Sequence, residues 1–547
     1  MDIKQNILKW YPFKENASVL EIYDEESILK NVNLNIKLDK CNIKNLSLNG
    51  EYDYITLIGT FEYVPTILDD CKCYSEFLKR LKKHLTPNGT ILIAIDNRLG
   101  VKYLTGGKYK NYSYIFEGME KKIQKGQANL LTKQEIIKFI REAEFENFKF
   151  YYPLPDYRFI NSIFTDDFMP KSSHSKILYP VNYDYGSTIL YNEINIFKQI
   201  CDIGQFDNFT NSYIVEISNN EIKNDICFVN YNNFRKDKYK LLLTIKKNEV
   251  EKIPESKEAI SHVKCIERNT NKLRELGFDV LEKIEENKII SPFEKEKELD
   301  KKLVETLEQY GKDAFKQEIR KWYNFILEKL PVELEYEDDI FKKYDIDISQ
   351  EQKKNLRFVK NGYIDLAFEN VFCKNDGYLL YDQEWYLQDV PIEFILYRAL
   401  NNLYTYNNIK LESKISREEI MEEFELKKYE TYFEQLERKI QADILNSEYV
   451  NQYQNEMKKY YNKIENIQNE LERKEKEIKE IIINKDKEIK EIIINKDKEI
   501  NEEKIKYNIL KNEKEKITKE YEGLLNEYNT SRGWKIIKTI RKVARKK

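Results

Sequence analysis

The apolar positions of residues 1–180 follow two periods. Three short apolar runs are typical of buried strands, at residues 17–22, 52–59 and 90–96. Between the last two runs, residues 73–85 have the apolar spacing of an amphipathic helix, and Thr86-Pro87-Asn88-Gly89 ends it. Strands that alternate with helices predict an α/β domain with a parallel, Rossmann-like sheet that is covered on both faces.

A further helix is expected over residues 131–145. Thr132 precedes the first apolar position, and Glu135 follows three residues later. This spacing is typical of a capping box, in which the two side chains satisfy the first backbone N–H groups of a helix.

A second region, residues 186–440, has a different pattern. Residues 241–253 indicate two β segments around a short turn, and helical spacing follows to about residue 360. Residues 363–385 alternate apolar and polar positions around Asn375-Asp376-Gly377, which is typical of a hairpin. We expect an α+β domain here.

Residues 450–530 are strongly charged and helical in pattern. The segment KEIKEIIINKD occupies 476–486 and recurs unchanged at 487–497. An 11-residue repeat places its isoleucines on one stripe and predicts a coiled coil, and therefore a homo-oligomer. A single solvated helix held by Glu–Lys pairs four residues apart is the alternative.

Residues 531–547 form a basic tip with eight Lys or Arg residues and no acid. Its apolar side chains share one helical face: Ile536, Ile537, Ile540, Val543 and Ala544, with Trp534 near the start. Such a segment suits the surface of an anionic membrane. A solvated helix end is the alternative, and we expect no nucleic-acid partner because no nucleic-acid module accompanies the tip.

Composition adds limits to these expectations. The net charge of −3 excludes a polycation, and the seven cysteines show no zinc or redox spacing. The N-terminal residues MDIKQNILKWYPF have no apolar signal core. We therefore expect a cytoplasmic protein that is peripheral on the inner membrane face.

Residues 1–180 resemble a known enzyme family. VLEI (19–22), YDYITLIGTFEYV (52–64) and LKRLKKHLTPNGTILIAIDN (78–97) stand in the order of its first, fourth and fifth strands. Together with YYPLPDYRFINSIFTDDFMP (151–170), they are similar to class I S-adenosylmethionine (SAM) methyltransferases found with bacterial surface-glycan glycosyltransferases. The resemblance implies glycosyltransferase partners.

The same resemblance implies a SAM site at the carboxyl ends of the strands. Asp39 would bind the ribose hydroxyls, and Glu21, Tyr23 and Glu62 would line the cofactor site. The family's glycine-rich loop is replaced by Tyr-Asp-Glu-Glu-Ser, and no glycine precedes Gly50. A retired methyltransferase domain kept as a scaffold is the alternative.

The second region carries a phosphotransferase-like spacing. Asp365 and Asn370 are five residues apart, and Asp382 follows twelve residues later in DQEW. This resembles aminoglycoside and choline kinases, in which Asp365 would act on the acceptor hydroxyl while Asn370 and Asp382 hold Mg²⁺ with ATP.

The phosphate lysine and its partner are less sharply marked. Lys252 would contact the nucleotide phosphates and Glu267 would be its helix-borne partner, with Lys246, Lys247 or Glu258 as competitors. Tyr363-Ile364 replace the usual His-Gly, and residues 205–245 lack a glycine-rich phosphate loop. Asp and Asn around a hairpin are also ordinary turn formers, which is the alternative interpretation.

Three functions follow from these patterns. The first is SAM-dependent methylation of a surface glycan or lipid-linked sugar. The second is phosphorylation of a sugar or amino alcohol with ATP and Mg²⁺. The third is a non-catalytic oligomeric scaffold for glycan-assembly enzymes.

Overall fold

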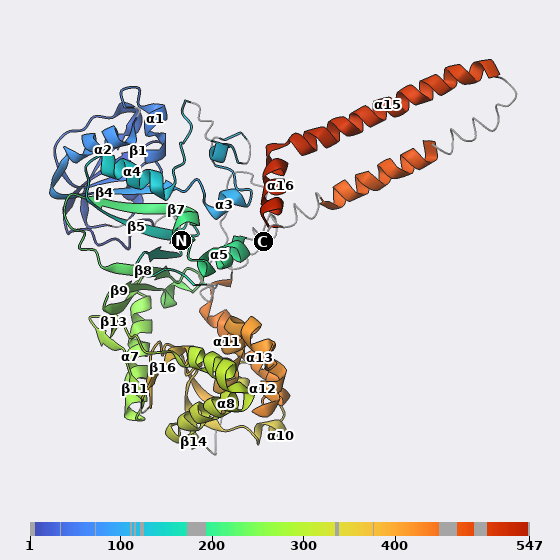
Figure 1. The fold of residues 1–547 in the computed structure, drawn as a ribbon. Coiled ribbons are helices and arrows are strands. Elements are labelled where there is room, and N and C mark those ends of the chain that lie inside the picture. Colours follow the sequence, from blue (N-terminus) through green and yellow to red (C-terminus); the bar gives the residue numbers. More distant parts are fainter. Residues whose placement is uncertain are drawn as a thin grey trace. The chain divides into compact units, whose positions relative to one another are not determined.

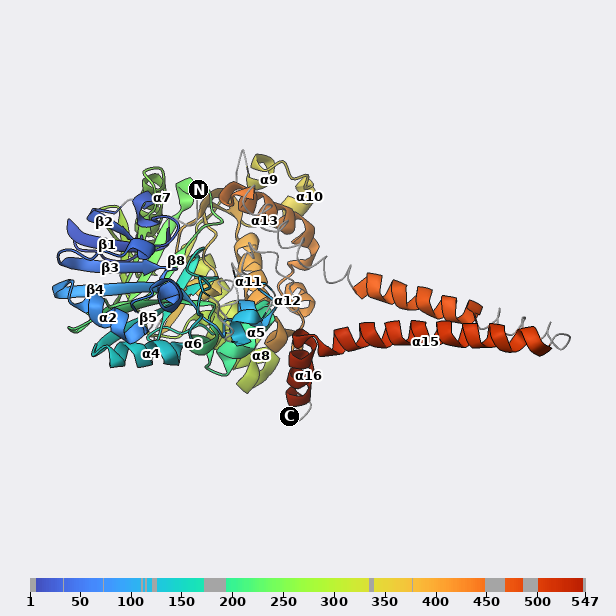
Figure 2. The same ribbon diagram turned by 90° about the horizontal axis from the view of Figure 1, so that it is seen from above.

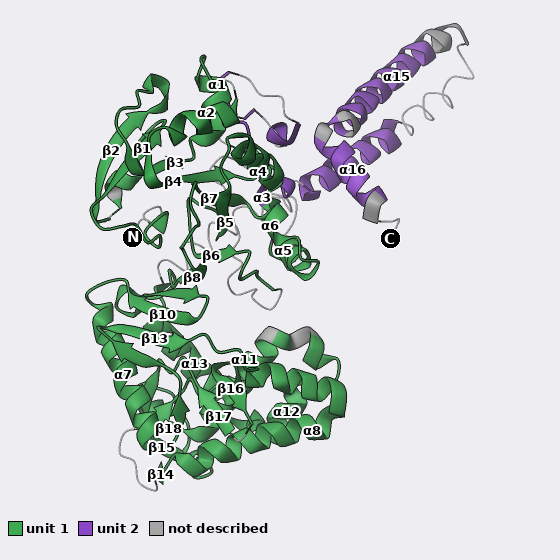
Figure 3. Cartoon of the chain, turned by 60° about the vertical axis from the view of Figure 1, so that its left-hand side comes forward, with its two compact units in different colours: residues 1–101, 130–181, 194–453 green, residues 102–129, 182–193, 454–547 purple. Residues whose placement is uncertain are grey.

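The computed structural model describes residues 6–32, 34–71, 73–109, 112–113, 116–120, 125–171, 193–333, 339–375, 377–447, 468–485 and 500–544. The chain divides into two compact units, coloured in Figure 3. Unit 1 comprises residues 1–101, 130–181 and 194–453, and unit 2 comprises 102–129, 182–193 and 454–547.

A 12-stranded mixed sheet is the centre of unit 1 (Figure 1). Its parallel part has the order β2-β1-β3-β4. The bounds are Ala17–Tyr23 for β1, Ile36–Asn42 for β2, Tyr52–Ile58 for β3 and Leu85–Asp96 for β4. The predicted parallel α/β sheet is confirmed for these strands.

The rest of the sheet is antiparallel and continues in the order β7-β5-β6-β8-β9-β10-β13-β12. The bounds are Asn147–Leu154 (β5), Ser162–Thr165 (β6), Ser212–Ser218 (β7), Ile226–Tyr231 (β8), Leu241–Lys246 (β9), Glu249–Pro254 (β10), Lys283–Glu285 (β12) and Lys288–Pro292 (β13). Strands from before and after residue 186 thus lie in one sheet. The domain boundary expected near this residue stays a prediction.

Alternate residues of the central strands face two separate cores. Ile91, Ile93 and Ile95 pack with α2 (Tyr74–Lys82) and α4 (Lys133–Glu142). Their neighbours Leu92 and Ala94 pack instead with residues 7–11, which are not in an α-helix. The strand period of two thus fills both faces, and the expected capping box of Thr132 and Glu135 is present at the start of α4.

The remainder of unit 1 is mainly helical and has its own core around Trp322. Its longer helices are α7 (Ala259–Glu275), α8 (Leu299–Lys329), α11 (Ile392–Glu412), α12 (Arg417–Glu423) and α13 (Glu430–Ile444). Two small sheets accompany them: β14-β15-β18 (Val332–Glu333, Phe358–Tyr363, Tyr386–Pro391) and β11-β17-β16 (Asp279–Val280, Gly377–Leu380, Val371–Lys374). The predicted hairpin corresponds to the antiparallel pair β16 and β17.

Short helices connect these elements. They are α1 (Val64–Ile67), α3 (Val101–Leu104), α5 (Glu193–Asp202), α6 (Phe206–Phe209), α9 (Ile340–Lys343), α10 (Gln350–Lys353) and the 3-10 helices η2 (Leu29–Asn31), η3 (Ile43–Asn45), η4 (Phe61–Tyr63), η5 (Glu117–Glu120), η7 (Asp237–Tyr239), η8 (Phe368–Asn370) and η9 (Lys427–Tyr429). Between β2 and β3 the chain forms η3 alone, without an α-helix or a further strand.

Unit 2 contains a helix over 468–485, then α15 (Ile500–Thr530) and α16 (Arg532–Ala544). Figures 1 and 2 show α15 running back alongside the first of these helices. Side chains from both line one small cavity of about 100 Å³. The second copy of the repeat, 487–497, lies outside the described residues, and the homo-oligomer stays a prediction. Within the described ranges, none of the helices has the length and apolarity that crossing a membrane requires.

Candidate functional site

A cluster of buried charges joins β10 to the segment after β17. Lys252 lies on β10, and its ammonium group contacts the carboxylate of Asp382. Two more carboxylate oxygens lie near this Nζ atom, at 3.5 Å for Glu282 and 3.6 Å for Glu384. Lys252 and Asp382 are 130 positions apart in the chain, so only the fold brings these two predicted residues together.

The charges of this cluster support one another. Burial alone would lower the pKa of Lys252, but Asp382, Glu282 and Glu384 outweigh it and hold that pKa above its usual range. Burial would likewise raise the pKa of Glu384, and the nearby Arg235 and Lys252 hold it well below its usual range instead. Both groups are therefore charged at neutral pH.

Asp365 follows β15 and is also buried. Its Oδ2 atom accepts hydrogen bonds from the backbone N–H groups of Glu384 at 2.9 Å and Trp385 at 2.7 Å. Its Oδ1 atom lies 3.5 Å from the guanidinium of Arg398. Burial raises the pKa of Asp365 to about 7, although Arg398 opposes the shift. A carboxyl with this pKa exchanges a proton readily near neutral pH.

Asn370 closes the loop that carries Asp365. Its Nδ2 atom donates to the backbone carbonyl of Asp365 at 3.1 Å, and Gln383 Nε2 donates to the same oxygen at 3.0 Å. The backbone N–H of Tyr381 donates to the Asn370 carbonyl at 3.0 Å. The neighbours of Asp382 on both sides, Tyr381 and Gln383, thus hydrogen-bond to the loop that carries Asp365 and Asn370.

The donor set of Asp382 and Asn370 fits Mg²⁺ only together with a ligand. Asp382 offers a carboxylate and Asn370 an amide oxygen, and Mg²⁺ is commonly held by one or two such groups plus substrate phosphates and water. In the part of the chain that the structure describes, no group of three His, Cys, Asp or Glu side chains could hold a metal ion by itself. Phosphate oxygens would have to complete the coordination.

Arg235 enters the cluster from the connection between β8 and β9. This connection has no glycine, and Arg235 Nη1 lies 2.6 Å from Glu384 Oε2. The guanidinium also lies over the Trp385 indole, 5.6 Å from its ring centre. Arg235 was not predicted from the sequence, because the lack of a glycine-rich phosphate loop in residues 205–245 was interpreted only as the loss of phosphate-binding groups.

Aromatic rings surround this ion pair. The His262 ring stacks on Trp385 with centroids 4.8 Å apart, and Tyr239 contacts both rings edge-on. His262 Nε2 lies 3.6 Å from Glu384 Oε2. Three aromatic rings thus pack around the Arg235–Glu384 ion pair.

Glu267, the predicted partner of Lys252, lies on α7 and is partly exposed. Its backbone carbonyl accepts from Thr270, and the carboxylates within ion-pair distance of Lys252 belong to Asp382, Glu282 and Glu384. Glu384 could have been found from the sequence, because it stands two residues after Asp382 in the quoted DQEW phrase.

The carboxyl ends of β1 and β3 form the other predicted site. The strand order reverses between these strands, which is the switch point where α/β sheets bind ligands. Glu21 is buried there, and it accepts from Ser27 Oγ at 2.5 Å, Ile28 N at 2.8 Å and Leu29 N at 3.1 Å. Glu21 therefore fixes the loop that replaces the glycine-rich segment.

Tyr157 covers the end of β3. Gly59 has a left-handed φ of 63°, and a Cβ atom there would meet the Tyr157 hydroxyl. Arg158 lies over the Tyr157 ring and pairs at 2.5 Å with Asp96, which ends β4. Glu62 in η4 is fully buried close by, and its charge helps to raise the pKa of Tyr157, after burial itself.

Asp39 and Tyr23 differ in their place along the strands. Asp39 is exposed within β2, which continues to Asn42, and it accepts from the Tyr52 hydroxyl at 3.1 Å. Tyr23 ends β1 and is half-buried, and its register partner is Asn42. The β2 side chain at the carboxyl edge is thus Asn42 and not Asp39.

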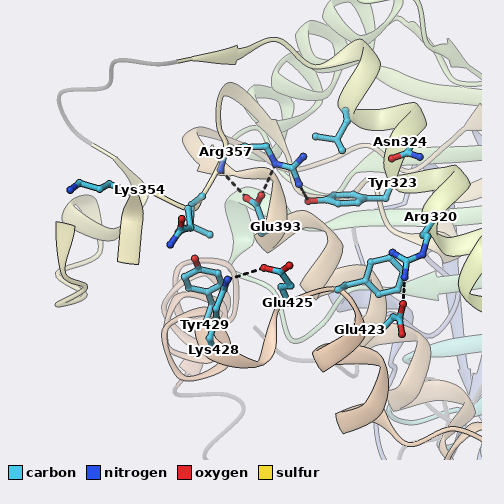
Figure 4. Close-up of a pocket in the computed structure, with 14 residues that line it drawn as sticks. Arg320, Tyr323, Asn324, Lys354, Arg357, Glu393, Glu423, Glu425, Lys428 and Tyr429 are labelled. Carbon is cyan, nitrogen blue, oxygen red and sulfur yellow. Dashed lines mark hydrogen bonds and ion pairs between the residues drawn. The ribbon is translucent and has the colours of Figure 1, made fainter. Parts of the chain in front are cut away.

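A separate pocket of about 540 Å³ lies beside α8 and the start of α11 (Figure 4). Arg357 donates from Nε to Glu393 at 2.8 Å and from Nη2 to the Tyr323 hydroxyl at 2.6 Å. Two further ion pairs line it: Lys428 with Glu425, and Arg320 with Glu423. Its guanidinium groups are engaged by its own acids, and we assign it no ligand.

No family model and no curated protein matches the chain. A SAM-dependent methyltransferase from Thermotoga maritima is similar over 40% of this chain and 87% of its own, at 14% identity and a TM-score of 0.23. PKMT2 from Rickettsia typhi, bound to AdoHcy, matches over 75% and 90%, at 10% identity and a TM-score of 0.20. An aminoglycoside phosphotransferase bound to ADP matches over 37% and 88%, at 10% identity and a TM-score of 0.16. At these scores, the fold description rests on the strand order and contacts above.

Proposed function

We propose that unit 1 binds a magnesium nucleoside triphosphate at the charge cluster around Lys252 and transfers its terminal phosphoryl group to a small hydroxyl compound. The contact between Lys252 and Asp382, next to the bonded pair Asp365 and Asn370, is the observation that supports this best. Phosphoryl transfer needs a lysine on the phosphates, metal-holding oxygens and a carboxylate for the attacking hydroxyl.

Each residue has a definite task in this proposal. Lys252 would contact the phosphates, and Asp382 and Asn370 would hold Mg²⁺, which would neutralise phosphate charge. Asp365 Oδ1 takes the proton of the acceptor hydroxyl, whose oxygen bonds to the γ-phosphorus while the bond to the β-phosphate oxygen breaks. The products are a nucleoside diphosphate and a phosphate monoester. A sugar or an amino alcohol is the acceptor class that we propose.

Ligand-dependent melting tests the binding step. ATP with Mg²⁺ should raise the melting temperature of the whole protein, because binding to the native state alone stabilises it. Asp382→Ala should abolish the rise. Asp279→Ala removes a carboxylate from the exposed end of β11 and should leave the rise intact. A wild-type protein that shows no shift with any nucleoside triphosphate and Mg²⁺ would contradict the proposal.

Methyl transfer is the second candidate function. The parallel order β2-β1-β3-β4 favours it, with buried Glu21 and Glu62 near the switch point. The acceptor would be a surface glycan or a lipid-linked sugar. Calorimetry with SAM tests this candidate. Glu62→Gln should weaken SAM binding, whereas Asp39→Ala, which changes an exposed side chain of β2, should leave it unchanged. Absence of heat from both SAM and the nucleotide would leave the scaffold role.

A further inference from the structure

The last helix of unit 2, α16, presents a row of cations to solvent. Lys535, Lys538, Arg541 and Lys542 are all exposed. None of the ion pairs found between described residues involves any of these four side chains. Residues 531–547 contain no acid that could neutralise them. This surface therefore carries concentrated positive charge.

The start of α16 is engaged inside unit 2. The Trp534 ring lies 4.9 Å from Tyr528 and under the guanidinium of Arg541. A Cβ atom at Gly533 would lie 3.6 Å from the Phe116 ring, so the helix also approaches the segment around Phe116. Trp534 is therefore packed against protein, and Ile540, at 57% exposure, is the large apolar side chain that α16 leaves open.

We propose that α16 is a docking surface for anionic lipid, with charge as the main attraction and Ile540 as its apolar contact. A polyanion such as RNA would also attract the cations, but it gains nothing from an exposed isoleucine on the opposite side of the helix. A lipid surface accepts both, because cations bind headgroups while an apolar side chain enters the acyl boundary.

Vesicle flotation of the full chain tests the proposal. The probe is phosphatidylcholine vesicles with or without about one third phosphatidylglycerol. The protein should float with the anionic vesicles and stay at the bottom with neutral ones. Since a cation near an anionic surface contributes roughly a fivefold gain in partition, glutamine at Lys535, Lys538, Arg541 and Lys542 should lower the partition coefficient by about 100-fold or more.

A matched variant separates the effect of the charge on α16 from the effect of the total charge of the protein. Glutamine at Lys506, Lys511, Lys516 and Lys519 removes the same number of exposed cations from α15 and should leave flotation unchanged. Ile540→Ser should lower the partition only severalfold, and 0.5 M salt should release the wild-type protein. Circular dichroism should show equal helix content in all variants.

The outcomes are distinct. Flotation that is equal on neutral vesicles, or lost equally in both glutamine variants, overturns the proposal. So does a wild-type protein that stays at the bottom with anionic vesicles while it shifts single-stranded RNA, which would make the surface a nucleic-acid site.

Discussion

At the scale of single residues, the charge cluster around Lys252 depends on how its largely buried charges balance. Four carboxylates, Asp365, Asp382, Glu282 and Glu384, face the cations Lys252, Arg235 and Arg398. A phosphate group would take the place of a carboxylate beside a guanidinium, which binds phosphate in a forked geometry. In the proposed function, Arg235 would supply the charge that a glycine-rich loop supplies with backbone N–H groups.

Arg235→Gln should therefore weaken binding of the magnesium nucleotide. The loss of one charge-assisted contact corresponds to about tenfold in Kd, or 1.4 kcal/mol. Calorimetric titration with ATP and Mg²⁺ measures it. Lys238→Gln, on the exposed part of the same connection, should bind as the wild type does. Tighter nucleotide binding by Arg235→Gln would mean that Arg235 blocks the proposed nucleotide site around Lys252.

The raised pKa of Asp365 predicts a dependence of stability on pH. Its pKa is about 7 in the folded chain against an ordinary 3.8, so between these values the folded state holds a proton that the unfolded state has lost. The contribution of Asp365 to the free energy of unfolding is thus complete below about pH 4 and falls as pH rises to 7. Relative to Asp365→Asn, the wild type should lose on the order of 4 kcal/mol of unfolding free energy over this range. Urea unfolding at several pH values measures the difference, and a constant difference would refute it.

At the scale of elements, the sequence pattern predicted the positions of single strands and helices better than it predicted which strands lie side by side. The apolar runs located β1 and β3 within a residue, and the Thr132 spacing located the start of α4. β4 begins at Leu85 and not at residue 90, because Thr86-Pro87-Asn88-Gly89 stays extended within the strand. Its pairing with β3 is irregular between Tyr52 and Tyr54. The position of β7 between β4 and β5 could not be predicted, since a strand's period does not encode its partner. The sequence pattern likewise does not show that Arg235 pairs with Glu384, which is 149 residues away.

The cap of α4 gives a prediction for one element. Thr132 Oγ1 accepts from the Glu135 backbone N–H and donates to its carboxylate at 3.0 Å, while the Thr132 N–H donates to the same carboxylate at 2.9 Å. Thr132→Ala should lower the free energy of unfolding by about 1 kcal/mol, because helix N–H groups lose their acceptor. Thr132→Ser keeps the hydroxyl and should cost much less. Urea denaturation compares them, and equal losses would contradict the role of the cap.

At the scale of the whole molecule, the chain joins two sets of strands in one sheet. The parallel strands from the first 100 residues and the antiparallel strands that carry Lys252 are linked through β7, β5, β6 and β8. The cores around Trp322 and around α2 and α4 lie entirely within unit 1. The residues of both proposed catalytic sites therefore belong to unit 1.

Self-association of α15 follows from a stripe of apolar side chains. They are spaced by alternate steps of three and four residues, with Lys514 in the one polar position: Tyr507, Leu510, Ile517, Tyr521, Leu524 and Tyr528. The neighbouring helix 468–485 shares a cavity with Leu510 and Ile517, yet Leu524 remains 63% exposed and Tyr528 50%. Further helices would stabilise a heptad stripe that stays this open, and we expect a second copy of the chain to supply them. Sedimentation velocity at about 10 µM should therefore show an oligomer, and Leu524→Lys should shift it toward the monomer, because a charge placed in the stripe loses its solvation.

Ile509→Lys is the control for this test. It alters a residue that is 55% exposed but lies outside the stripe, and it should leave the oligomer intact. Equal dissociation by both variants, or a monomeric wild type at every concentration, would show that α15 pairs only within its own chain.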